Sequence, residues 1–122
     1  MIKYQESEEM YLETILLLKQ KSANVHAVNV AEELGYSRAS VSRGVNLLVK
    51  KGYILIAPDG KISFTAEGKV KAEDIYERHT VITKLLVKIG ADREIAEDNA
   101  CRIEHVITPE LFEVLRKYVK YY

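Results

Sequence analysis

The chain has no tryptophan, two prolines and a single cysteine among its 122 residues. One cysteine cannot close an intrachain disulfide, so we expect a fold without covalent cross-links and a reducing, cytoplasmic setting. No apolar run is long enough to span a bilayer, and the acidic first ten residues lack the apolar stretch of a signal peptide. We therefore expect a cytoplasmic protein with no membrane partner.

The chain also lacks an excess of charge of either sign, because 18 basic residues balance 18 acidic ones. That balance argues against a polycation that binds nucleic acid through its net charge alone. The hydrophobic share of 48% and the charged share of 30% are those of an ordinary folded domain. Low-complexity tracts and internal repeats are missing too, so we expect a folded globular chain of about one domain's length.

Helical periodicity is the main pattern in the sequence. We expect helices over residues 7–21, 28–34, 38–51, 66–89, 91–107 and 109–122, with Ser7, Ser37, Thr65 and Thr108 as N-caps. Residues 53–64 are β-prone around the turn signal Pro58-Asp59-Gly60, which predicts a small hairpin. The predicted fold class is mostly α, with a winged helix-turn-helix in residues 1–65 followed by a helical region in residues 66–122.

Acidic residues are absent between Glu33 and Asp59, although the whole chain is neutral. The cations in this window are Arg38, Arg43, Lys50 and Lys51. Cations that replace condensed counterions drive binding to DNA phosphates, and small residues let a helix enter the major groove. The predicted DNA contacts are Ser37, Arg38, Ala39, Ser40, Ser42, Arg43, Lys50 and, on the hairpin, Lys61. The alternative is a solvated face without a partner.

A single winged helix grips DNA weakly, so we expect a homodimer that reads a palindromic operator. The last helix carries an apolar stripe that suits such a dimer and suits ordinary core packing equally well. Its members are Phe112, Leu115, Val119 and Tyr122.

A cluster of metal-binding residue types lies in the stretch "EDNACRIEH". On a helix, Glu97, Cys101, Glu104 and His105 would share an arc of roughly 100°. Thiolate, carboxylate and imidazole together suit a divalent transition ion, and other segments must complete the site. Further candidates are Met10 and Glu13 in the first helix and His79 in the long helix. Taken singly, each of these residues is more often a core or surface residue than a ligand.

Three alternatives remain beside a metal-sensing regulator. A winged-helix transcription factor that responds to another effector would bind DNA without a metal. A metal buffer would bind ions without DNA, which the acid-free window argues against. An enzyme with Cys101 as nucleophile and His105 as base would need an oxyanion hole, and no motif indicates one, so we expect no enzyme.

Four segments together resemble the diphtheria toxin repressor family of iron- and manganese-dependent repressors. They are "EEMYLETILLL", "VNVAEELGYSRASVSRGVNLLVKKGYI", "TAEGKVKAEDIYERHTVITKLL" and "DNACRIEHVITPE". The resemblance implies a repressor whose winged helix binds operator DNA and whose later helices bind metal and dimerise. It also implies a short form, without the SH3-like domain that many members carry.

The resemblance also implies a set of metal ligands. In the iron-responsive branch, the positions of Met10, Cys101, Glu104 and His105 hold a regulatory ion, and the position of His79 belongs to a second ion. This chain departs from that second site, with Thr83 and Glu97 at positions where the branch has a glutamate and a histidine. The position of Glu13 is a ligand in the manganese-responsive branch. We therefore expect a hybrid site for Fe(II) first and Mn(II) next, because sulfur ligands favour the later, softer metals.

Overall fold

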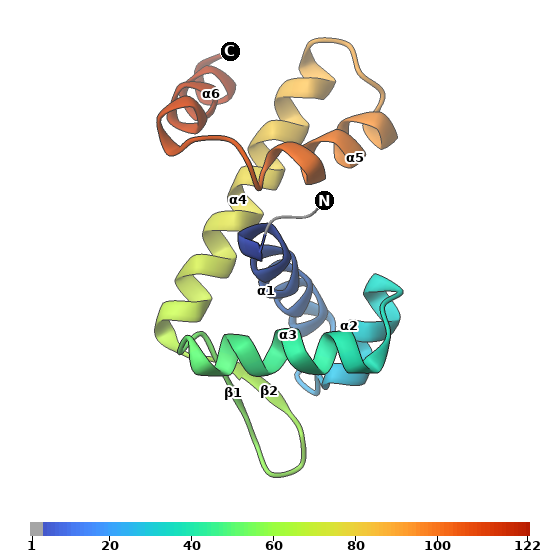
Figure 1. The fold of residues 1–122 in the computed structure, drawn as a ribbon. Coiled ribbons are helices and arrows are strands. Elements are labelled where there is room, and N and C mark those ends of the chain that lie inside the picture. Colours follow the sequence, from blue (N-terminus) through green and yellow to red (C-terminus); the bar gives the residue numbers. More distant parts are fainter. Residues whose placement is uncertain (1–3) are drawn as a thin grey trace. The chain divides into compact units, whose positions relative to one another are not determined.

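The computed structural model describes residues 4–122, with side chains from residue 8 onward, and confirms the mostly α fold class (Figure 1). The helices are α1 (Tyr4–Lys21), α2 (Ala27–Leu34), α3 (Arg38–Lys50), α4 (Ala66–Lys88), α5 (Arg93–Ile103) and α6 (Pro109–Tyr121), and the strands are β1 (Ile54–Ile56) and β2 (Ile62–Phe64). By its contacts the chain divides into two units, one ending at Glu73 and the other beginning at Asp74.

The first unit contains the expected winged helix-turn-helix. Helices α1, α2 and α3 contact one another in pairs, and α3 contacts β1. Its core side chains are almost completely buried: Leu12, Ile15, Val30, Val41, Val45, Leu48, Ile54 and Ile62. The turn between α2 and α3 is short because Gly35 ends α2 in the left-handed region, at φ 71°, and Ser37 caps α3 two residues later.

Strands β1 and β2 form the wing, an antiparallel pair in which Ile54 faces Phe64 and Ile56 faces Ile62. Two further hydrogen bonds hold β2 at its first residue, Ile62, beside the turn of the wing. The Ile62 amide donates to the Val25 carbonyl at 2.8 Å, and Lys19 Nζ donates to the Ile62 carbonyl at 3.0 Å. The turn-side end of β2 is therefore tied to α1 and to the segment before α2.

Helix α4 starts close against the backbone that precedes the wing. Thr65 caps it as expected, accepting a hydrogen bond from the Gly68 amide at 3.0 Å. The Thr65 hydroxyl donates to the Gly52 carbonyl at 2.7 Å. A Cβ at Gly68 would collide with the carbonyl oxygen of Tyr53, so this approach requires glycine.

The second unit comprises the rest of α4 with α5 and α6. Its buried apolar side chains include Ile75, Ile82, Ala96, Ala100 and Phe112. An ion pair between Arg116 Nη2 and Glu77 Oε1, at 2.9 Å, links α6 to α4.

Two expected helix boundaries differ from the structure by three residues or more, and the others by at most two. Helix α1 begins at Tyr4, so Ser7 lies inside the helix instead of capping it. Helix α5 ends at Ile103 instead of residue 107, because Thr108 takes the extended conformation that a following proline favours and caps α6. Within the described residues, every helix is too short or too polar to cross a bilayer.

Candidate metal centre

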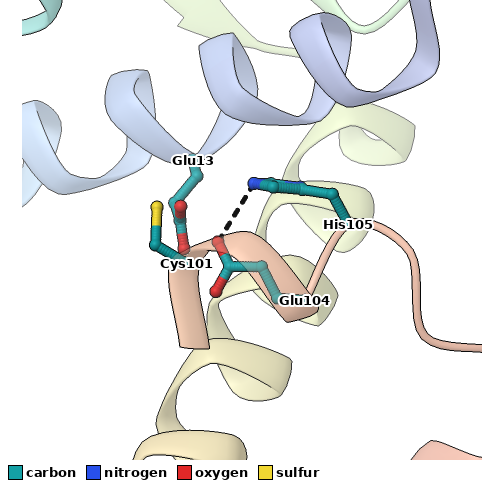
Figure 2. Close-up of side chains that lie close together, drawn as sticks. All are labelled: Glu13, Cys101, Glu104 and His105. Atoms are coloured by element: carbon teal, nitrogen blue, oxygen red, sulfur yellow. Dashed lines mark ion pairs between the residues drawn. The ribbon is translucent and has the colours of Figure 1, made fainter. Parts of the chain in front are cut away.

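The C-terminal end of α5 brings three potential metal ligands together in the second unit. The ligand atoms of Cys101, Glu104 and His105 lie within 4.8 Å of one another. Figure 2 shows these side chains and the ion pair between Glu104 Oε1 and His105 Nε2, which are 3.2 Å apart. Because α5 stops at Ile103, His105 lies in the turn after the helix and still comes close to Glu104.

Glu104 is the most constrained member of this group. Its side chain is fully buried, and its other carboxylate oxygen, Oε2, lies 2.7 Å from Nδ1 of His79 on α4. Histidines therefore face both oxygens of this carboxylate. A buried carboxylate is costly unless positive charge or hydrogen bonds compensate it, so this arrangement suits a site that takes up a cation.

The donor set of Cys101, Glu104 and His105 fits a divalent transition ion. Sulfur and imidazole nitrogen favour the later, softer metals, whereas Mg²⁺ and Ca²⁺ prefer oxygen alone. Cys101 is a free thiol that reaches the protein surface. An ion can therefore reach the group from solvent.

The structure does not bring Glu97 into this group. Glu97 lies one turn before Cys101 on α5, is exposed, and pairs with Arg93 at 3.1 Å. On α4, one turn after His79, Thr83 is buried but offers no carboxylate.

In the first unit, Met10 and Glu13 lie on α1, three residues apart and therefore on one side of that helix. The Tyr36 hydroxyl, in the turn between α2 and α3, donates to Sδ of Met10 at 4.0 Å. The ring of Tyr36 also meets the ring of Tyr11 edge-on, with centroids 6.4 Å apart. This contact, which was not predicted from the sequence, links a predicted ligand to the residue before the N-cap of α3.

The environment of Tyr11 raises the pKa of its phenol above the ordinary value. Burial is the largest cause that raises the pKa of Tyr11, and Tyr36 raises it further. Arg43, on α3, has the opposite effect on that pKa.

The predicted DNA contacts lie on and beside α3, and their surroundings differ. Arg38, Ala39, Ser42, Arg43 and Lys50 are exposed, as is Lys61 on the wing. The Ser37 oxygen caps α3 by accepting from the Ser40 amide at 3.2 Å, and its hydroxyl donates to Ser40 Oγ at 3.0 Å. Both serines therefore help to shape the start of α3.

Lys51, the fourth cation of the acid-free window, has a different role. It pairs with the buried carboxylate of Glu8 on α1, at 2.5 Å. Lys51 is itself exposed, as are Arg38, Arg43, Lys50 and Lys61.

Comparison with known proteins gives matches along both units. The model described as "Iron dependent repressor, N-terminal DNA binding domain" matches residues 3–62. The model described as "Iron dependent repressor, metal binding and dimerisation domain" matches residues 65–122.

Individual proteins show the same likeness. The chain is 32% identical to the diphtheria toxin repressor of Corynebacterium diphtheriae over 116 residues, which are 94% of this chain and 51% of that protein. It thus spans about half the length of that relative. It is 29% identical to an uncharacterized HTH-type transcriptional regulator of Methanocaldococcus jannaschii over 117 residues, 94% of each chain. A manganese-dependent transcriptional repressor solved with manganese has the same fold, with a TM-score of 0.86 at 21% identity over 94% of this chain and 53% of that one.

Proposed function

The chain belongs to the iron-dependent repressor family, and on this premise we propose that it is a metal-dependent DNA-binding repressor of metal-homeostasis genes. The observation that carries the proposal is that Cys101 and His105 lie close to the buried carboxylate of Glu104. Neither a winged helix that responds to another effector nor a catalytic site accounts for this group as simply.

DNA binding is assigned to the exposed face of α3 and to the wing. Arg38 and Arg43 suit guanine edges or phosphate, whereas Lys50 and Lys61 suit phosphate alone. Ser37 and Ser40 shape the start of α3, and Ala39 and Ser42 are small enough for close approach to the groove. The operator proposed for a symmetric homodimer is a palindrome.

Metal binding is assigned to Cys101, Glu104 and His105, together with Met10 and Glu13 of α1. His79 joins the set through its contact with Glu104. Glu97 is left out because it is exposed and pairs with Arg93. A thioether and a thiolate among the ligands favour Fe(II), with Mn(II) next.

The proposed coupling depends on the charges of these residues. Glu13 and Glu104 belong to different units, and two carboxylates that share a site repel each other. A divalent cation bound there would offset that repulsion. The bound ion then favours the state in which ligands from both units hold it. We propose that this state binds the operator more tightly, so the affinity for operator DNA depends on metal.

The proposal is tested by selecting sequences from a pool of random duplexes, with Fe(II) or Mn(II) and with a chelator. We expect the metal-loaded protein to enrich palindromic sequences and to bind them roughly 5–150-fold more tightly than the chelated protein does, the usual range of such coupling. Cys101→Ala should reduce that ratio while leaving the fold intact. Asp98→Ala, an exposed change on the same helix, is the matched control and should leave the ratio unchanged.

Equal affinity with and without metal would contradict the proposal and favour the metal-independent winged-helix alternative. Metal uptake without any duplex binding would favour the buffer alternative instead.

A further inference from the structure

His26 connects the start of α2 to the turn of the wing. It is the N-cap residue of α2, and its backbone amide donates to Asn29 Oδ1 at 2.8 Å. Its ring nitrogen Nε2 lies 3.1 Å from the backbone carbonyl oxygen of Asp59. Because a carbonyl oxygen only accepts, Nε2 must carry the hydrogen and donate.

The turn of the wing is shaped to receive this ring. Gly60 has φ 91°, and a Cβ there would stand only 3.0 Å from Cδ2 of His26. The glycine therefore serves two purposes, because it adopts the left-handed conformation and leaves room for the imidazole.

The same turn holds Lys61, the wing residue that the proposed function places on a DNA phosphate. The Lys61 amide donates to Asp59 Oδ1 at 3.0 Å, and the Lys61 carbonyl accepts from the Ala57 amide at 2.9 Å. The backbone of Lys61 is thus fixed to Asp59, the residue whose carbonyl His26 holds.

Ile62, the first residue of β2 and the residue directly after Lys61, is anchored separately, by its hydrogen bonds to Val25 and to Lys19. Loss of the His26 side chain should therefore free the turn at Asp59 and Gly60 while the strands of the wing remain in place. We infer that His26 is a positioning residue that fixes the wing turn so that Lys61 meets the DNA backbone. This inference rests on the proposed DNA-binding function.

The test measures how the affinity for a labelled mixed-sequence duplex depends on salt, for the full chain loaded with Mn(II). In the wild-type background, Lys61→Ala should make the negative slope of log K against log salt shallower by about 0.9, the value for one phosphate contact. Near 0.1 M salt this corresponds to a loss of roughly 8-fold in affinity. In a His26→Ala background the wing turn is already free, so Lys61→Ala should change slope and affinity far less. His26→Gln should restore the Lys61 effect, because its amide nitrogen can donate to the Asp59 carbonyl.

Arg38→Ala is the matched control, since it removes a charge from α3, away from the wing. Its effect should be the same in both backgrounds. If Lys61→Ala has an effect of the same size in the wild-type and the His26→Ala backgrounds, the inference is overturned and the proposed DNA binding stands. A failure of His26→Gln to rescue would overturn the hydrogen-bonding role. A wild-type chain that binds no duplex at any salt concentration would overturn the proposed function, and the inference with it.

Discussion

Gly68 shows, at the scale of a single residue, how a close approach reverses the usual effect of a substitution. In an exposed helix interior, Gly→Ala stabilises by up to about 1 kcal/mol. At Gly68 the added Cβ would collide with backbone, the carbonyl oxygen of Tyr53, which cannot move aside as a flexible side chain can. We expect Gly68→Ala to lower the free energy of unfolding by about 1–3 kcal/mol, the usual cost of overpacking, as measured by urea denaturation.

Lys69→Ala is the control for this substitution, because Lys69 is the exposed neighbour of Gly68 on the same helix. It should change the free energy of unfolding by less than about 0.5 kcal/mol. An increase in stability for Gly68→Ala would show that α4 can move away from Tyr53.

The residue types and their spacing indicated much of the candidate site, but they did not indicate which other side chains surround each residue. The cluster of Cys101, Glu104 and His105 was predicted from its spacing, and the structure brings these residues together. Glu97 has the same spacing argument yet remains in solvent, because Arg93 lies one turn away and pairs with it. Spacing alone cannot decide between these outcomes, since a carboxylate on a helix surface is stabilised equally well by a neighbouring arginine.

At the scale of the element, α6 has two apolar sides. Phe112 is buried within the second unit, whereas Leu111, Val114 and Tyr118 are 51%, 60% and 42% exposed. The exposed three lie at positions i, i+3 and i+7, so they form one continuous stripe. Exposed apolar stripes of this kind mark interaction surfaces, and the matching family model describes a dimerisation domain.

We predict that Val114→Asp shifts the protein from dimer to monomer, as measured by sedimentation at micromolar concentration. The reason is that a charge in the centre of an apolar interface has no partner to offset its desolvation. Lys120→Asp places the same aspartate on the far side of α6 and should leave the dimer intact. If wild type and Val114→Asp sediment alike, the dimer interface does not include this stripe of α6.

At the scale of the whole molecule, metal binding should appear as stability. A ligand at one hundred times its dissociation constant stabilises the folded state by about 2.7 kcal/mol, which for a chain of this size raises the melting temperature by about 10 °C. We expect Mn(II) to cause such a shift under anaerobic conditions and a chelator to reverse it, as followed by circular dichroism. Mg(II) should cause almost none, because it prefers sites made of oxygen alone. Equal shifts with Mg(II) and Mn(II) would mean that the sulfur and imidazole ligands are not used.

The order and type of the elements follow from the sequence by itself. Gly35, Ser37, Thr108 and Pro109 act on the backbone within a few residues, so their effects were predictable, and so was the turn at residues 58–60. The start of α1 and the end of α5 were predicted less well, because helix ends depend on weak local preferences.

Only the tertiary structure decided which polar groups meet. Residues 79 and 104, whose side chains meet at the buried carboxylate, are 25 positions apart, and residues 26 and 59, which join α2 to the wing, are 33 apart. No periodicity links positions so far apart, since helical and strand repeats act only over a turn or two. Packing of the apolar faces brings these groups together, and their hydrogen bonds then determine which of the predicted residues lie in a shared site.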